Sequence, residues 1–229
     1  MIGIIGAMSV EIEKIKSTIQ DKKEMIVSGI TFASGKIHEK DVVVAVCGIG
    51  KVFAATCAQT MILKFNPEVI LNIGVAGTLT NKLGIADIAI ADNMVQHDMD
   101  TSPIGDPVGL ISGINIIQIP CSQSIVDIIE KCVDELGIHF EIGTIASGDQ
   151  FVVDKNRKDR IVKEFDAIAC EMEGAAIGQV CYINKVDYAV IRAISDSADG
   201  NSHMDYAEFT IKAAENSTKV INQFIHRYQ

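Results

Sequence analysis

The sequence predicts an α/β protein in which a central mixed, mostly parallel sheet lies between two layers of helices, in one domain spanning residues 1–229. Short runs rich in β-branched residues alternate with longer segments of helical periodicity, which is typical of strand–helix–strand units. Several of the short runs are apolar at every position, as expected of strands covered by helices on both faces. A chain of 229 residues can bury a large core of this kind.

Short apolar runs mark the strands of this sheet. Two further runs, Met25–Val27 and Ile30–Ile37, flank Ser28-Gly29 and alternate in polarity, which predicts an antiparallel hairpin. The expected buried strands are Ile2–Ile5, Val42–Cys47, Val69–Ile73, Ile88–Ala91, Ile142–Ala146, Ala167–Cys170 and Tyr188–Ile194.

Helical periodicity fills most of the remaining chain. Ser9 is expected to cap a first helix with an isoleucine face, and Asn66-Pro67 and Gly137 end two of the others. Residues 96–113 carry two prolines and three glycines and predict a long, functional loop. The remaining helices are expected at Lys51–Phe65, Gln123–Leu136, Lys155–Phe165, Gly174–Ile183 and Tyr206–Arg227.

Charge and composition exclude several functions. A formal net charge of −10 repels phosphate backbones, so no nucleic-acid partner is expected. Glycines and charges interrupt every apolar run before membrane-spanning length, and no membrane partner is expected. The His97-Asp98-Met99-Asp100 segment lacks a further His or Cys at ligand spacing, so neither a metal site nor a cofactor is predicted.

The cysteines are scattered, without a CxxC pair, and most lie in apolar runs. We therefore expect buried, reduced thiols and a cytoplasmic protein. The six positions are Cys47, Cys57, Cys121, Cys132, Cys170 and Cys181.

Acidic residues follow three of the predicted strands. Glu11 comes after the first, Glu171 and Glu173 come after another in the run CEMEGAA, and Asp196 ends the run VIRAIS. Because ligands of α/β sheets bind beyond the carboxyl ends of strands, these side chains are candidates for one site. Each also has a structural interpretation, as a first-turn acid or a loop cap, and both interpretations stay open.

Two glycine segments lie at similar positions. Gly74-Val75-Ala76-Gly77 follows one strand and Gly48-Ile49-Gly50-Lys51 follows another. Neither matches a dinucleotide fingerprint or a P-loop. A close approach to a ligand and a tight strand-to-helix turn remain equally acceptable interpretations.

Motifs along the whole chain resemble one enzyme family. GIIGAMSVEIE, CGIGKV, NIGVAG, HDMD, ASGDQFV, CEMEGAA, and RAISDSAD followed by His203 occur in this order. Together they resemble the 5′-methylthioadenosine/S-adenosylhomocysteine nucleosidases, within the purine nucleoside phosphorylase fold group. EMEGAA with RAISD is specific to nucleosidases and phosphorylases, whereas GAM with Glu11 favours the nucleosidases.

This resemblance implies a nucleoside phosphorylase-like fold, a homodimer whose partner subunit completes the 5′ pocket, and no cofactor. The implied activity is hydrolysis of the N-glycosidic bond of 5′-substituted adenine nucleosides such as 5′-methylthioadenosine, S-adenosylhomocysteine and 5′-deoxyadenosine.

The resemblance also implies residue roles. Glu11 activates the attacking water, Glu173 binds ribose hydroxyls, Asp196 protonates adenine at N7, and Arg192 orients the water site. Phe151 stacks on the purine, the Val152 backbone contacts its edge, Met172 packs on the sugar and Ser195 orients the acid. The substrate-binding positions are Met8, Val75, Gly77, Phe151, Val152, Glu171, Met172, Ser195, Tyr206 and Ile104.

Cleavage of such a bond passes through an oxocarbenium-like state and needs an acid that is protonated at neutral pH. An aspartate pKa is ordinarily about 3.9, and a close guanidinium would lower it further, so we expect Asp196 to be shielded from Arg192.

A phosphate-dependent purine nucleoside phosphorylase is the alternative activity, but it needs basic groups for the phosphate dianion. Arg157, Arg160 and Arg227 are expected on solvated surfaces, and Glu11 would repel phosphate. A nucleoside-binding protein without turnover is a further alternative, although all three carboxylates are present.

Two departures from the family pattern bear on the substrate. Val75 replaces the serine that the family commonly has beside the water site. The loop Thr101–Gly109 lacks the aromatic residues that relatives place around the 5′ group, and Ile104, Pro107 and Tyr206 are expected to form an apolar wall instead. The 5′ preference therefore stays open.

Overall fold

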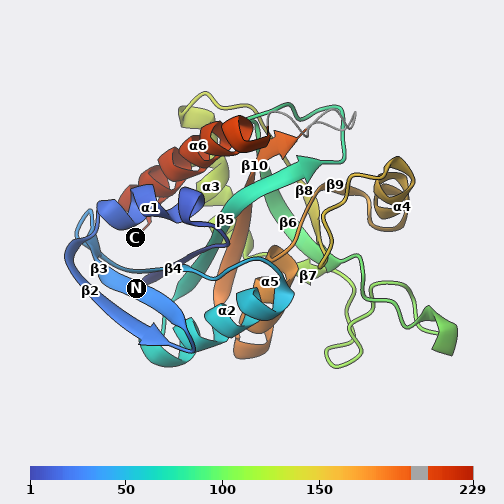
Figure 1. The fold of residues 1–229 in the computed structure, drawn as a ribbon, viewed down its shortest axis with the longest axis horizontal. Coiled ribbons are helices and arrows are strands. Elements are labelled where there is room, and N and C mark those ends of the chain that lie inside the picture. Colours follow the sequence, from blue (N-terminus) through green and yellow to red (C-terminus); the bar gives the residue numbers. More distant parts are fainter. Residues whose placement is uncertain (197–205, 229) are drawn as a thin grey trace.

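The computed structural model describes residues 1–196 and 206–228, and within the last helix it describes side chains from residue 214 onward. Figure 1 shows a sheet with helices on both faces. The strands are β1 Ile2–Gly6, β2 Gln20–Val27, β3 Ile30–Ile37, β4 Lys40–Val46, β5 Val69–Thr78, β6 Ile88–Gln96, β7 Ile119–Pro120, β8 Phe140–Ser147, β9 Ala167–Glu171 and β10 Asp187–Asp196. The helices are α1 Ser9–Ser17, α2 Lys51–Phe65, the 3₁₀ turn η1 Ser102–Ile104, α3 Gln123–Glu135, α4 Lys155–Phe165, α5 Gly174–Asn184 and α6 Tyr206–Arg227.

The strands of the described chain form one mixed sheet in the order β10-β6-β8-β9-β5-β1-β4-β3-β2, with β7 beside β6. Pairing is parallel among β4, β1, β5 and β10 and among β6, β8 and β9. It is antiparallel at the β2–β3–β4 edge and where β10 meets β6 and β5 meets β9. Since β5 also pairs with β10, the strands β5, β10, β6, β8 and β9 close on themselves.

Helices cover the sheet in two layers, which confirms the predicted three-layer α/β/α fold (Figure 1). Helices α1, α3 and α6 pack together on one face, and α2 packs against α5 on the other. Helix α4 packs on β8 and β9. In the described part of the chain, no helix combines the length and apolar character that crossing a membrane requires.

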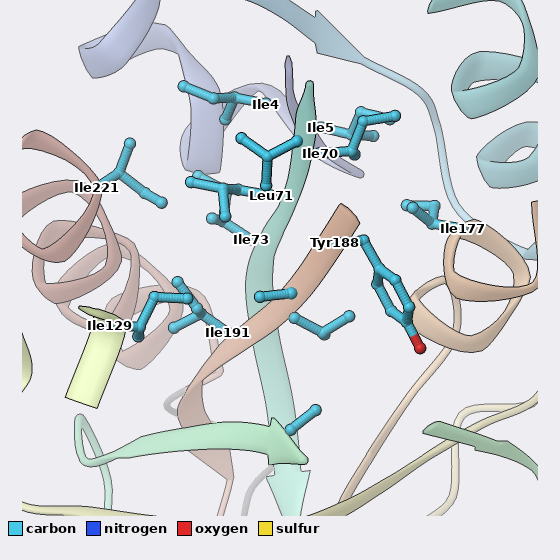
Figure 2. Close-up of a cluster of buried hydrophobic side chains, with 14 of the residues drawn as sticks. Ile4, Ile5, Ile70, Leu71, Ile73, Ile129, Ile177, Tyr188, Ile191 and Ile221 are labelled. Atoms are coloured by element: carbon cyan, nitrogen blue, oxygen red, sulfur yellow. The ribbon is translucent and has the colours of Figure 1, made fainter. Parts of the chain in front are cut away.

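Alternating side chains of the central strands fill the core on both faces of the sheet (Figure 2). Leu71 and Ile73 of β5 point toward α6, whereas Ile70 of the same strand points to the opposite side, near Tyr188. All four side chains are buried. Strand β5 is therefore apolar on both faces, as its sequence predicts.

The expected strands and helices are present, the short strand β7 and the 3₁₀ turn η1 were not expected, and three further details differ. Met8 rather than Ser9 caps α1, and Ser9 is the first residue of that helix. Gly74-Val75-Ala76-Gly77 is not a turn, because β5 continues through it to Thr78 while pairing with β10. The hairpin's first strand begins at Gln20 rather than Met25. As expected, the six cysteines are buried and unpaired.

The strand register places residues of three strands next to one another near the carboxyl ends of those strands. Gly77 of β5 lies beside Asp196 of β10 on one side and Cys170 of β9 on the other. A methyl group on Gly77 would lie 2.8 Å from an Asp196 carboxylate oxygen, so only glycine leaves room for that acid. The chain's closed arrangement of strands thus gathers residues from distant segments.

Truncation of a core side chain on β5 should destabilise the whole protein. We expect Ile73→Ala to lower the free energy of unfolding by about 2–5 kcal/mol, because it leaves a cavity where Ile73 is fully buried. Urea unfolding monitored by circular dichroism measures this. Ile26→Ala, at an exposed position of β2, is the control and should change stability by less than about 0.5 kcal/mol.

Candidate active site

A single pocket lies at the carboxyl ends of β1, β5, β9 and β10. It encloses about 650 Å³, a volume that includes the open solvent at its mouth. Its lining is mostly apolar with a few carboxylates. The lining residues are Ala7, Met8, Glu11, Ile49, Val75, Ala76, Gly77, Gln150, Phe151, Val152, Cys170, Glu171, Met172, Glu173, Ser195 and Asp196.

Glu11 lies in the first turn of α1 and is almost fully buried. One carboxylate oxygen accepts hydrogen bonds from the amides of Ala7 (2.8 Å) and Met8 (2.9 Å), and the other accepts one from Val75 (3.2 Å). Burial raises the pKa of Glu11, while these amides and Arg192 act in the opposite direction. The first two bonds are those of a helix-capping acid, but the third fixes the carboxylate at the pocket wall.

Glu171 and Arg192 form a buried ion pair beneath the pocket. The Glu171 carboxylate also accepts hydrogen bonds from the amides of Glu173 (3.0 Å) and Gly174 (2.8 Å) and from the Ser147 hydroxyl. These amides belong to the N-terminus of α5, where a carboxylate is stabilised by the helix dipole.

The same guanidinium nitrogen of Arg192, Nη2, also donates a hydrogen bond to the Asn72 side-chain oxygen at 2.5 Å. Burial opposes its charge, but Glu171, Glu173 and Glu11 together raise the pKa of Arg192. This arginine therefore remains charged and stabilises the acidic cluster. It does not line the pocket, and lies behind it.

Glu173 caps the N-terminus of α5 and lines the pocket. Its carboxylate accepts a hydrogen bond from the Gly50 amide at 2.8 Å. Burial, followed by repulsion from Glu171, raises the pKa of Glu173 to about 7, and Arg192 limits the rise. Burial thus makes this carboxyl a weaker acid than an exposed glutamate.

Asp196 ends β10 and is 3% exposed. Burial raises its pKa, opposed by Lys158, whose Nζ lies 4.0 Å from Oδ2. Arg192 is instead engaged by Asn72 and Glu171. The arrangement has the predicted separation between Asp196 and Arg192, but the cation beside Asp196 was not expected from the sequence.

The structure brings most of the predicted site residues together, with three differences. Arg192, predicted to orient the water site, does not border the pocket, because its guanidinium is engaged by Asn72 and Glu171 behind it. Ile104 projects from the loop after β6, is 82% exposed and does not line the pocket, because that loop extends away from the sheet (Figure 1). Tyr206 begins α6, but its side chain lies outside the described residues, as does His203. The predicted residues that border the pocket are Glu11, Glu173, Asp196, Met8, Val75, Gly77, Phe151, Val152, Glu171, Met172 and Ser195.

Several contributors were missed by the sequence analysis. Ile49 borders the pocket, and Asn72 and Ser147 hold the Arg192–Glu171 pair. Lys158 carried a usable signal, since it occupies the same face of α4 as Ile161. A lysine on an apolar helix stripe indicates a buried partner.

The HDMD segment is part of a hydrogen-bonded support beside the pocket. Lys51 Nζ lies 2.7 Å from an Asp98 carboxylate oxygen and 3.0 Å from the Gln96 side-chain oxygen. The other Asp98 oxygen accepts a bond from the Asp149 amide, and Asp149 in turn accepts one from the Lys51 amide. These contacts hold the segment before Phe151 against the start of α2.

Basic side chains are absent from the described residues that border the pocket. Arg157, Arg160 and Arg227 lie on the surface, where they contact Gln150, Asp100 and Glu135, respectively. A pocket lined by carboxylates and apolar groups suits a neutral ligand with hydroxyl and amine donors. It offers little to hold a phosphate dianion.

Comparisons with known proteins match this fold and pocket. The family model described as Phosphorylase superfamily matches residues 1–226. The 5′-methylthioadenosine/S-adenosylhomocysteine nucleosidase of Staphylococcus haemolyticus is 36% identical over 98% of this chain and 99% of its own length. The aminodeoxyfutalosine nucleosidase of Helicobacter pylori is 40% identical over 98% and 97%.

A solved structure agrees in detail. The crystal structure of 5′-methylthioadenosine/S-adenosylhomocysteine nucleosidase from Neisseria meningitidis, in complex with methylthio-immucillin-A, superposes with a TM-score of 0.94 at 31% identity, and the match covers 98% of both chains. The fold and the pocket are those of an enzyme of the nucleoside phosphorylase class. The chain belongs to the phosphorylase superfamily and, within it, to the family of 5′-methylthioadenosine/S-adenosylhomocysteine nucleosidases.

Removal of the buried Arg192 guanidinium should lower the stability of the protein. We expect Arg192→Met to lower the free energy of unfolding by about 3–5 kcal/mol, because the Glu171 charge is then buried without its partner. Chemical denaturation measures the loss. Arg160→Met breaks an exposed ion pair with Asp100 and should cost less than about 1 kcal/mol. An Arg192→Met protein as stable as the Arg160→Met control would contradict the assignment.

Proposed function

We propose that this protein hydrolyses the N-glycosidic bond of 5′-substituted adenine nucleosides and releases adenine and the 5′-substituted ribose. The observation that carries the proposal is the desolvated Asp196, whose pKa is raised by burial, in one pocket with Glu11 and Glu173. Membership of the nucleosidase family supports the same reaction.

Asp196 is the proposed general acid. Adenine is a poor leaving anion, so N7 must gain a proton as the bond from C1′ to N9 breaks, and such transfer contributes roughly 10²–10⁴-fold in rate. A carboxyl whose pKa is raised by burial keeps its proton to higher pH than an exposed aspartate does. The second carboxyl oxygen can accept a hydrogen bond from the exocyclic amine, which a 6-oxopurine lacks.

Glu11 and Glu173 are proposed to act on the sugar side. Glu11 orients the water and takes its proton, and Glu173 binds the ribose hydroxyls. In a water-poor pocket their negative charge also stabilises the oxocarbenium-like state. Arg192, which contacts Glu171, keeps this group of acids compatible with burial.

Residues around the base and sugar complete the proposed site. Phe151 stacks on adenine, the Val152 backbone hydrogen-bonds its edge, and Met172 packs on the ribose. Ser195, which precedes the acid in β10, orients it. Since Val75 offers only its amide to Glu11, a polar side-chain contact of serine-containing relatives is absent at this wall.

Water rather than phosphate is the proposed acceptor. The described pocket lining contains carboxylates and no basic side chain. A phosphate dianion near Glu11 would be repelled. This supports hydrolysis over phosphorolysis.

The proposed substrates are 5′-methylthioadenosine, S-adenosylhomocysteine and 5′-deoxyadenosine. Aminodeoxyfutalosine is a second candidate, since the aminodeoxyfutalosine nucleosidase of Helicobacter pylori is 40% identical over nearly the whole chain. The proposed location is the cytoplasm, where six unpaired thiols would remain reduced.

We also propose a homodimer, in which the partner subunit completes the 5′ side of the pocket. Exposed apolar residues lie at the start of α2, where Val52 and Phe53 project, and at the end of α5, where Tyr182 and Ile183 project. These helices pack side by side, so their outer surface suits a second copy. Ile49, which borders the pocket, is the neighbouring exposed residue.

The activity test is adenine release in phosphate-free buffer. We expect the wild type to release adenine from at least one of the proposed substrates, at a rate that added phosphate does not increase. Asp196→Asn should lower kcat by about 10²–10⁴-fold, because the amide cannot donate a carboxyl proton. Asp127→Asn, at an exposed position of α3, is the charge-matched control. A strict phosphate requirement, or near wild-type turnover by Asp196→Asn, would contradict the proposal.

The oligomer is tested by sedimentation equilibrium. Phe53→Glu places a charge on the proposed contact surface and should shift the protein from dimer to monomer by at least a tenfold rise in the dissociation constant, since burying an unpaired charge costs several kcal/mol. Ile26→Glu, on the edge strand β2, should leave the dimer intact. A wild-type monomer at micromolar concentration would refute the proposal.

A further inference from the structure

Lys158 lies on the buried face of α4, whose other buried residues are apolar. The buried side chains of α4 are Lys158, Ile161 and Phe165, and Lys158 is only 6% exposed. Lysine is almost never buried to this extent without a partner. The position therefore calls for an acidic group nearby.

Asp196 is that group, with 4.0 Å between Lys158 Nζ and Asp196 Oδ2. Both side chains are more than nine-tenths buried, so solvent screens their attraction poorly. The distance is longer than a direct hydrogen bond, and the interaction is between charges rather than between a fixed donor and acceptor. Lys158 itself does not border the pocket.

Other charged groups near this pair are few in the described structure. From β9, the Cys170 thiol lies close to both, and burial, with Asp196 as the next cause, raises its pKa to about 12, so it stays neutral. Glu171, also on β9, is neutralised by Arg192. From β5, Gly77 lies beside the Asp196 carboxylate. Within residues 1–196 and 214–228, Lys158 is the cation that acts on this acid.

The proposed reaction needs Asp196 in two states. The proton moves from the Asp196 carboxyl to N7 of adenine while the electron pair of the C1′–N9 bond goes to the base. The water oxygen then bonds to C1′ and gives a proton to Glu11. Burial alone would favour the protonated acid but would leave the resulting carboxylate destabilised. A cation 4.0 Å away compensates for that new charge.

We propose that Lys158 is a positioning residue for the general acid: its ammonium holds the Asp196 carboxyl toward the base and stabilises the carboxylate that remains after proton transfer. The inference rests on the proposed nucleosidase function. It assigns to α4 a part in the chemistry, although none of its side chains borders the pocket.

The test is the pH profile of kcat/KM for adenine release, measured for Lys158→Met. The falling limb, which reports loss of the acid's proton, should move upward by about 1–3 pH units when the nearby cation is removed. Because a weaker acid transfers its proton more slowly, kcat below that limb should fall by roughly tenfold, with little change in KM. Lys158→Arg keeps the charge and should restore the wild-type profile.

Lys155→Met is the matched control. Lys155 lies on the same helix, is exposed and pairs with Asp159, so its removal changes the charge of α4 without touching Asp196. Its pH profile should coincide with that of the wild type. If an active Lys158→Met protein also has the wild-type pH profile, the proposed role of Lys158 is overturned, while the proposed nucleosidase function stands. A wild type that releases no adenine would overturn the proposed function with it.

A second readout does not require turnover. Carbon-13 NMR of aspartate-labelled protein follows the Asp196 carboxyl, which is identified by its loss in Asp196→Asn. We expect its titration midpoint to rise by about 1–3 pH units in Lys158→Met. Where Lys158→Met fails to fold, Lys158→Gln replaces it in both experiments. An unshifted midpoint in a folded variant would refute the inference.

Discussion

A buried guanidinium is the constraint on which the rest of the pocket depends. Carboxylates removed from water repel one another and lose hydration, and three of them, Glu11, Glu171 and Glu173, surround Arg192. Arg192 can compensate for this because its guanidinium contacts Glu171 directly and is held in place by the Asn72 side-chain oxygen. Glu11 and Glu173 at the pocket wall are therefore stabilised by a group that does not itself border the pocket.

The second acidic region is electrically separate. Asp196 has Lys158 as its neighbour, and Arg192 is engaged with Glu171. One pocket thus contains carboxyl groups with different compensating cations. Burial raises the pKa of each, but the strength and distance of the compensating cation differ. This difference allows acid and base chemistry to coexist within a single cavity.

Local sequence patterns were sufficient to predict the fold, because β5 and its neighbours are apolar on both faces and clear stop signals separate the helices. They also carried the strand-end acids Glu11, Glu173 and Asp196. The continuation of β5 through Gly74–Gly77 was not predictable locally, since only pairing with β10 makes those glycines part of a strand. Lys158 was missed for a related reason: its partner lies 38 positions further along the chain, and only the packing of α4 brings them together.

Helix α2 connects the pocket with the exposed apolar surface proposed for the dimer contact. Its N-cap residue Gly50 donates its amide to Glu173, and three residues further along Phe53 projects from the outer surface of the molecule. A second copy bound to that surface would fix the start of α2 and, through the Gly50 amide, the Glu173 carboxylate. Under the proposed dimer, turnover per subunit would then decline on dilution, and an enzyme assayed at picomolar concentration would underreport the rate that it sustains at higher concentration.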